Sequence, residues 1–568
     1  MDKKKVKNTV DKKESKSKKI SKVSVTTKFT ILAIILIAIF SISLTPVTLQ
    51  NDTYYTIKIG EHITQYGIDM KDPFSWHQNL AYTYPHWLYD LITYNIYSSF
   101  GMQGIYITTC ILSAILGISI YLVNTKLAKN QILSFFITLG AMYMIRGYIA
   151  ARAQLVTFIL FILTIFFIEK FLETKKKRYA VGLIIIPILI ANLHLAVFPF
   201  YFVLYLPYIA EYIIATLGEI VIYRKIELKN LKRKIAKSSK NQENKDKVEE
   251  LEIQLNKLEE KIDKVKIKRT KELKNPYKIR LVKNDNVKWL ILIMVICLFT
   301  GLLTPLGTTP YTYLVKTMEG NTTQNINEHL PMTMINEKEV LCALIILISV
   351  LFFSKVKIRL NDLMMIGGLF VLMIASKRQV TMFVLIGSVI LNKIIMELFN
   401  LYNKGSLEKF VNKITTKIGM VLTIIAMLLV SLYMAKDKFD DKYIDESTYP
   451  VNACDYILEN VDLGQARFYN EYNYGSYMLF RGIPVFIDSR ADLYAPEFSG
   501  KKDDIFMDFI ETSSIAKFYE DTFEKYNITH AIMYKNSKIN MIIEKTKDPN
   551  YKKLYEDKYF VVYQRLNV

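Results

Sequence analysis

The sequence predicts a mostly α-helical polytopic membrane protein with about eleven transmembrane helices, a C-terminal extracytoplasmic α/β domain and a cytosolic helical hairpin insert. Three observations lead to this prediction. Hydrophobic residues make up 51% of the 568 residues and gather in long uninterrupted runs. The formal net charge is +21, and Lys and Arg lie between those runs. Residues 436–568 change to short β-rich runs that alternate with helical stretches.

Eleven apolar runs are candidates for membrane spans. A helix needs about 20 apolar residues to cross a bilayer, because its backbone groups find no water there. The first run follows a Lys- and Ser-rich tail and is too long for a signal-peptide core, so we expect an uncleaved anchor. The candidate spans are residues 29–49, 104–124, 131–149, 154–172, 180–197, 199–222, 288–304, 339–355, 361–376, 379–396 and 418–435.

The basic loops predict the orientation of these spans. With the N-terminus in the cytosol, the loops that fall inside are basic, and the loops 50–103 and 305–338 fall outside. We therefore expect a multi-pass protein of the cytoplasmic membrane with an extracytoplasmic C-terminus. Its expected parts are a disordered tail (1–28), six spans (29–224), a cytosolic insert (225–287), five spans (288–435) and an outer domain (436–568).

Charge and cysteine usage exclude several classes of protein. The basic residues flank apolar runs, where they set topology, so we expect no nucleic-acid partner. Three of the four cysteines lie in apolar runs and Cys454 stands alone in the tail, which excludes a disulfide framework or a cysteine metal site.

The insert 225–287 carries apolar residues at heptad spacing, with Glu and Lys between them. Leu251, Leu255, Leu258, Ile262 and Val265 follow this spacing after a polar break. The pattern predicts an antiparallel helical hairpin. It is either a solvated spacer between two spans or a coiled-coil surface for a partner.

Asp52 stands where the first apolar run ends. A half-buried carboxylate at that depth suits a general base, or a ligand for a divalent cation such as Mg²⁺ or Mn²⁺. It also fits an ordinary carboxylate at the membrane interface. Glu328 and His329, in the outer loop 305–338, form a second candidate acid/base or metal pair.

Several basic or polar residues interrupt the apolar runs near the same outer surface. Arg152, His194 and Arg378 are among them, and a charge at this depth should face a polar cavity or the interface. Cations gathered there fit an anionic head group, such as a lipid-linked phosphate. The alternative is that they reach toward membrane lipids, which we favour for Lys377.

Ten segments, taken in order, resemble a group of uncharacterised bacterial multispan proteins related to GT-C glycosyltransferases, and distantly the catalytic subunits of oligosaccharyltransferases. The tail 1–28 and the insert 225–287 are outside the resemblance. The segments are Asp52-Thr-Tyr-Tyr, Asp72-Pro-Phe-Ser, His86-Trp-Leu, Arg152-Ala-Gln, Asn192-Leu-His, Thr304-Pro-Leu-Gly, Ile326-Asn-Glu-His-Leu-Pro, Ser376-Lys-Arg-Gln, Tyr472-Asn-Tyr-Gly-Ser-Tyr and Phe486-Ile-Asp-Ser-Arg-Ala-Asp-Leu-Tyr.

The resemblance implies a GT-C architecture and inverting sugar transfer from a polyprenyl-phosphate-linked donor on the outer face of the cytoplasmic membrane. Asp52 and Glu328 would be the catalytic pair, with Asp52 as base or metal ligand. The other assignments are donor-phosphate binding by Arg152, Arg378, His86 and His194, and acceptor contact by Asp72, Tyr474, Asp488, Arg490 and Asp492. The last group fits a salt-bridge network inside the outer domain equally well.

Two other functions stay open at this point. One is a transporter or assembly factor for an envelope polysaccharide or glycolipid, although the sequence has no internal repeat. The other is a sensor whose coiled coil at 225–287 reports an outside ligand.

Overall fold

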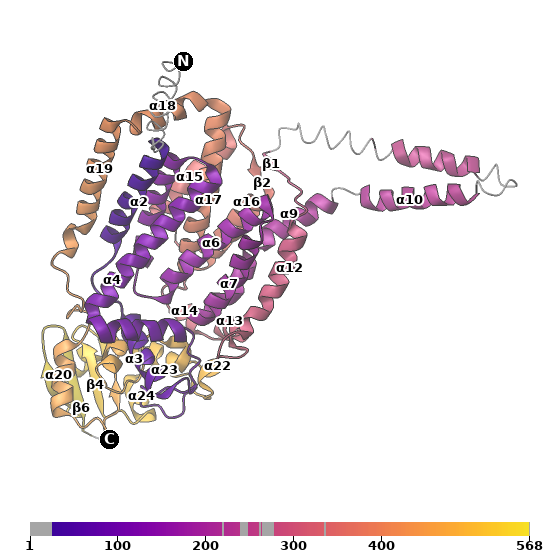
Figure 1. Cartoon of the computed structure of the whole chain (residues 1–568). Helices are drawn as coiled ribbons and strands as arrows, with labels where there is room; N and C mark the ends of the chain where they lie inside the picture. The colour runs from indigo at the N-terminus through magenta and orange to yellow at the C-terminus, as the bar shows by residue number, and fades with distance from the viewer. Residues whose placement is uncertain are drawn as a thin grey trace, which may run out of the picture.

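The computed structural model describes residues 25–217, 221–238, 248–260, 263, 278–333, 335 and 337–566. Long helices run side by side in one body, and a smaller domain of helices and strands covers one end of them (Figure 1). The N-terminal tail up to residue 24 and the insert positions Ile262 and Val265 lie outside the described residues.

All eleven expected apolar runs contain helix. The helices of this body are α2 (Val25–Leu44), α4 (Trp87–Ala128), α5 (Gln131–Met144), α6 (Ala153–Thr174), α7 (Lys177–Leu193), α8 (Phe198–Val203), α9 (Leu206–Leu217), α12 (Val287–Leu298), α15 (Lys338–Phe353), α16 (Leu360–Ala375), α17 (Val380–Tyr402) and α19 (Lys417–Ala435).

Among the described residues, six helical segments are long and apolar enough to cross a membrane. They are Thr27–Leu44, Trp87–Ala128, Ala153–Thr174, Leu195–Thr216, Lys377–Tyr402 and Lys417–Lys438. Three shorter apolar helices accompany them. By length and composition the chain is a membrane protein, and the count of eleven spans stays a prediction.

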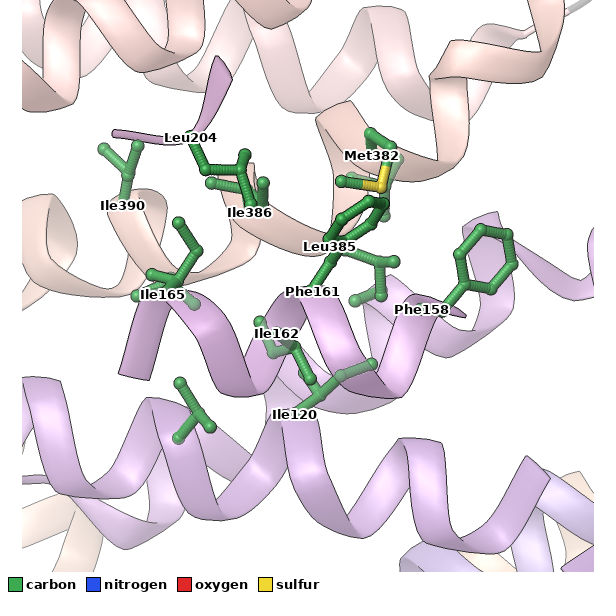
Figure 2. Packing of buried hydrophobic residues seen from close by; sticks show 14 of the residues in the cluster. Ile120, Phe158, Phe161, Ile162, Ile165, Leu204, Met382, Leu385, Ile386 and Ile390 are labelled. Atoms are coloured by element: carbon green, nitrogen blue, oxygen red, sulfur yellow. The ribbon is translucent and has the colours of Figure 1, made fainter. Parts of the chain in front are cut away.

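The centre of the helical body is packed with branched and aromatic side chains. On α6, Phe158, Phe161, Ile162 and Ile165 follow the spacing of one helix face. They meet a matching row on α17 that includes Leu385 (Figure 2). This close packing fixes the positions of the helices. It thereby fixes the polar residues at the helix ends that face the outer domain.

The first outer loop is largely helical, which its polar sequence did not predict. Helix α3 (Asn51–Tyr66) packs along the start of α4, and Gly101, with φ of 61°, marks a kink inside α4. Gly60 permits this approach, because a Cβ there would lie 2.2 Å from the carbonyl oxygen of Asp90.

The C-terminal domain, called the outer domain after its predicted orientation, is an α/β unit built on a four-stranded sheet. The strands are β3 (Phe468–Tyr469), β4 (His530–Tyr534), β5 (Tyr551–Glu556) and β6 (Phe560–Arg565), in the order β3-β4-β6-β5. Only β3 and β4 are parallel. Its helices are α20 (Val451–Asn460), α21 (Tyr472–Phe480), α22 (Pro496–Ser499), α23 (Ile505–Ser514), α24 (Tyr519–Lys525) and α25 (Lys538–Thr546).

Helix α3 and the outer domain share one apolar core. Tyr54 of α3 makes edge-on ring contacts with Tyr449 and Tyr477, at centroid distances of 5.0 and 5.1 Å. Each such pair adds about 0.5–1.5 kcal/mol beyond the area that it buries. The first outer loop and the C-terminal domain are therefore one structural unit.

The insert projects from the helical body (Figure 1). Helix α10 (Val221–Ser238) and the helical residues 248–260 are linked by an ion pair of Lys232 with Glu259 at 2.9 Å. The returning chain is anchored to the body, because β1 (Ile279–Arg280) pairs with β2 (Ile358–Arg359) and Arg359 binds the buried Glu211 at 2.7 Å. A coiled-coil partner for the insert stays a prediction.

Replacing residues 229–274 by a short Gly/Ser bridge should leave the apparent Tm of the detergent-solubilised protein unchanged, since the anchoring strand is kept. The control Arg359→Met leaves Glu211 buried without its cation and should cost about 3–5 kcal/mol. A fall in Tm of the deletion variant as large as that of Arg359→Met would show that the hairpin supports the membrane helices.

Candidate functional site

A cavity of about 880 Å³ lies between the membrane helices and the outer domain. One side of its wall comes from α3, from α13 (Thr309–Glu319), from residues 325–329 and from the turn η4 (Lys377–Gln379). The other side comes from residues 471–473, 489–493 and 506–513 of the outer domain. Asp52, Arg152, Glu328 and Arg378 all line it.

Asp52 reaches the cavity because α3 begins at the residue before it. Asp52 lies in the first turn of α3, where a carboxylate is favoured by the helix dipole. Asn51 donates from its Nδ2 atom to the carbonyl oxygen of Tyr472 at 2.9 Å. The start of α3 is thus tied to the outer domain at the cavity wall.

Glu328 and Arg378 are brought together by backbone pairing. The Arg378 N–H donates to the Glu328 carbonyl oxygen at 2.9 Å, and the Lys377 N–H donates to that of Leu330 at 2.9 Å. A third bond, from Met332 to Ile374 at 3.1 Å, continues the pairing. The loop after α13 is therefore fastened to the turn between α16 and α17.

Arg152 bridges the two candidate catalytic carboxylates. Its Nη2 atom lies 3.0 Å from Asp52 Oδ2, and its Nη1 atom lies 3.2 Å from Glu328 Oε1. Burial alone would raise the pKa of Glu328, but the charges of Arg152 and Arg378 outweigh it, and the pKa lies below its usual value. One guanidinium therefore contacts both carboxylates.

Arg378 differs from Arg152 in its partners. Within the described ranges, none of the ion pairs involves its guanidinium, which lines the cavity. Burial lowers the pKa of His86 to about 3, and Arg378 adds to the effect. Burial and Arg378 also lower the pKa of His329 to about 4. These imidazoles are neutral at physiological pH, so the arginines supply the positive charge here.

His86 and His194 meet at the cavity wall. Their ring centroids lie 5.0 Å apart, and His194 Nδ1 shares a hydrogen bond of 2.7 Å with the Thr157 hydroxyl. Both residues are placed beside the arginines that the sequence assigned to the same site.

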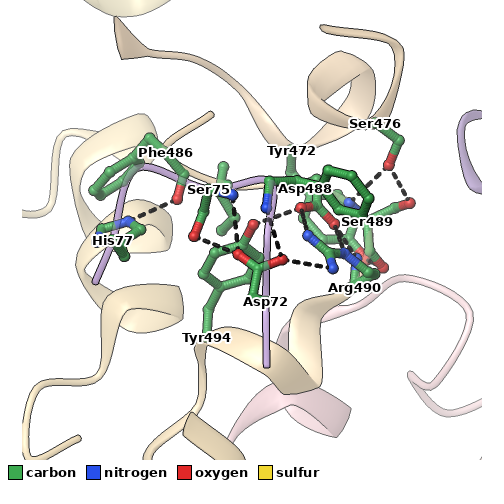
Figure 3. Close-up of polar contacts among 12 residues, drawn as sticks. Asp72, Ser75, His77, Tyr472, Ser476, Phe486, Asp488, Ser489, Arg490 and Tyr494 are labelled. Carbon is green, nitrogen blue, oxygen red and sulfur yellow. Dashed lines mark hydrogen bonds and ion pairs between the residues drawn. The ribbon is translucent and has the colours of Figure 1, made fainter. Parts of the chain in front are cut away.

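Asp72, Asp488 and Arg490 form a buried ion cluster that joins the first outer loop to the outer domain (Figure 3). Arg490 Nη1 lies 2.8 Å from Asp72 Oδ1, and its Nη2 lies 2.7 Å from Asp488 Oδ2. Ser75 and Tyr494 donate further hydrogen bonds to the two aspartates. Of the three residues, only Arg490 lines the cavity. The cluster is a salt-bridge network, which was the second of the two interpretations that the sequence allowed for these residues.

The other two expected acceptor residues have different positions. Asp492 lines the cavity and accepts hydrogen bonds from the Tyr313 and Thr322 hydroxyls, at 2.6 and 3.1 Å. Burial raises its pKa above the ordinary value. Tyr474 is fully buried in the outer domain and donates to the carbonyl oxygen of Ile532, away from the cavity.

Sequence reasoning missed Glu471, which also lines the cavity. Burial raises its pKa to about 7, partly offset by the backbone of Tyr534. Its position directly before the Tyr472-Asn-Tyr-Gly segment was the available signal.

The donor set at Asp52 does not fit a divalent cation. Across the residues that the structure describes, no group of three or more His, Cys, Asp or Glu side chains is placed to hold a metal ion. Asp52 and Glu328 are both engaged by Arg152. A metal ion that bridged the two carboxylates would compete with that guanidinium.

Arg490→Met should lower the free energy of unfolding by about 3–5 kcal/mol, because two buried aspartates lose their cation. Lys442→Met is the matched control, since its ion pair with Glu446 is exposed to solvent. Thermal unfolding of both variants in detergent measures the difference. Equal Tm values would mean that the cluster contributes nothing to holding the loop on the domain.

Glu471→Gln should stabilise the protein at about pH 8 by about 1–3 kcal/mol. Between the ordinary pKa of 4.5 and about 7, the folded state binds a proton that the unfolded state lacks, so wild-type stability falls as pH rises. The gain should shrink toward about pH 5. Thermal unfolding across this range is the measurement, with the exposed Glu459→Gln as control. A gain that does not change with pH would contradict the burial of Glu471.

Searches of family models and of curated proteins find no match to this chain. Two solved structures of the Archaeoglobus fulgidus oligosaccharyltransferase share its fold. The first is AglB in complex with an inhibitory peptide and a dolichol-phosphate, with TM-score 0.52, 11% identity, and coverage of 90% of this chain and 70% of that chain. The second is the apo form, with TM-score 0.52, 11% identity, and coverage of 89% and 69%.

This likeness extends over nearly the whole chain and confirms the resemblance at the level of fold. The bacterial source stays a prediction. The chain therefore has a GT-C-like fold, similar to that of the Archaeoglobus fulgidus oligosaccharyltransferase.

Proposed function

We propose that the protein is a GT-C-type glycosyltransferase, which transfers a sugar from a polyprenyl-phosphate-linked donor to an acceptor on the outer face of the cytoplasmic membrane. The observation that carries this proposal is the convergence of Asp52, Arg152, Glu328 and Arg378 on one cavity. The fold likeness to an oligosaccharyltransferase solved with a dolichol-phosphate supports the same class of donor.

The donor phosphate is placed at Arg378. This guanidinium lies on the membrane side of the cavity, at the turn between two membrane helices. A planar fork of donors suits two phosphate oxygens. The polyprenyl chain then extends toward the lipid, and the sugar extends into the cavity.

The acceptor hydroxyl is placed at Asp52. Arg152 contacts this carboxylate through Oδ2, and we assign the acceptor proton to Oδ1. The acceptor oxygen forms a bond to the anomeric carbon while the bond from that carbon to the phosphate oxygen breaks. The phosphate leaves with the electron pair, and Asp52 takes the proton. Attack opposite the leaving group inverts the anomeric centre.

The developing charge on the phosphate requires fixed positive charge rather than a proton. Of the three arginines that line the cavity, Arg378 is the one in none of the described ion pairs, and Arg152 lies in the same cavity. Groups fixed in advance lower the barrier because they need no rearrangement during the reaction.

Asp52→Asn keeps the size of the side chain but removes the carboxylate, so sugar transfer should fall at least about 10²-fold, or roughly 3 kcal/mol of barrier.

Arg378→Lys keeps the positive charge but loses the planar fork of the guanidinium, and it should mainly raise KM for the donor. The neighbour Lys377→Met is the matched control, because Lys377 does not line the cavity.

The measurement is sugar transfer from a panel of polyprenyl-linked donors in membranes, at equal amounts of folded protein. Unchanged transfer in Asp52→Asn would exclude Asp52 as the base. Wild-type protein that is inactive with every donor would favour the transporter or assembly function.

A further inference from the structure

The position of Arg152 bears on whether the site takes a metal ion. Its two terminal nitrogens contact the two carboxylates that converge on the cavity, Asp52 at 3.0 Å and Glu328 at 3.2 Å. Arg152 and Asp52 are both mostly buried, with side chains 22% and 23% exposed. A divalent cation bound between these carboxylates would compete with this guanidinium for Asp52 Oδ2 and Glu328 Oε1.

The fold fixes Arg152 in this position from two sides. Arg152 directly precedes α6, and the Thr53 hydroxyl of α3 donates to the carbonyl oxygen of the adjacent Ala151 at 3.3 Å. The backbone of Arg152 is thereby held against the first turn of α3, which carries Asp52. Glu328 is fixed in turn by its backbone bond from Arg378.

Around Arg152 the charges balance without a metal ion, when the other charged residues of the cavity wall, Arg490, Glu471 and Asp492, are left out of the count. Two carboxylates, Asp52 and Glu328, face two guanidinium groups, Arg152 and Arg378. Adding a divalent ion would place two further positive charges beside both arginines, which like-charge repulsion opposes. The neutral His86 does not change this balance.

We infer that Arg152 is a built-in cation that takes the place of a divalent metal ion, so that the site works without one. Arg152 holds the two carboxylates in position and adds its charge to that of Arg378 around a phosphate. The part that concerns phosphate rests on the proposed function, whereas the competition between Arg152 and a metal ion does not.

Mn²⁺ titration of the full-length detergent-solubilised protein, without a histidine tag, tests the inference. Free Mn²⁺ is counted by electron paramagnetic resonance. Wild type should show no specific site. Arg152→Met frees both carboxylates and should bind Mn²⁺ at least about tenfold more tightly than wild type, while Arg152→Met/Asp52→Asn should lose that gain.

A wild-type protein that binds about one Mn²⁺ per chain, and loses it in Asp52→Asn, would overturn the inference. A folded Arg152→Met protein that gains no affinity would overturn it as well. Should Arg152→Met fail to fold, the wild-type titration and its Asp52→Asn control still decide between the outcomes.

Sugar-transfer activity gives a second, separate test of the inference. Transfer that persists in EDTA supports the inference, whereas transfer that EDTA abolishes and Mn²⁺ restores contradicts it. If no donor is used at all, the proposed function fails, and the Mn²⁺ titration still tests the role of Arg152.

Discussion

The buried contact of Arg490 with Asp72 and Asp488 holds the outer domain on the first outer loop, and the cavity exists because these two parts stay together. A buried ion pair is stable only when its remaining hydrogen-bonding groups are satisfied. Here Ser75 donates to Asp72, and Tyr494 donates to Asp488. The shared core around Tyr54 adds non-directional packing, while the ions fix the register of the loop against the domain.

Charge is distributed unevenly within the cavity. Arg152 is bound by two carboxylates, whereas Arg378 is left to act on the cavity itself. Burial keeps His86 and His329 neutral, so neither competes for an anion as a second cation. The cavity thus contains one guanidinium outside the described ion pairs and, at the start of α3, the carboxylate of Asp52.

The sequence predicts the helical body well and the site only in part. Apolar runs of membrane length have few alternatives to helix, and each of the eleven runs contains helix. Helix α3 was missed because its half-buried, mixed sequence is stabilised by the outer domain rather than by its own pattern. The motifs around Asp52, Arg152, Glu328 and Arg378 identified the cavity residues. The bridging role of Arg152 depends on a contact between distant segments, which no local pattern encodes.

Glu471 and Tyr474 also show that a local motif does not predict which side chains face the cavity. Glu471 lies just before the motif and lines the cavity. Tyr474 lies three residues later, inside the motif, and points into the domain core. Helix α21 begins between them at Tyr472, so Glu471 has an extended backbone just before the helix while Tyr474 lies in its first turn. A motif therefore locates the wall of a site, but the helix that carries it selects which side chains face the cavity. For this chain that selection leaves Glu471 and Asp492 as the carboxyl groups of the outer domain that line the cavity.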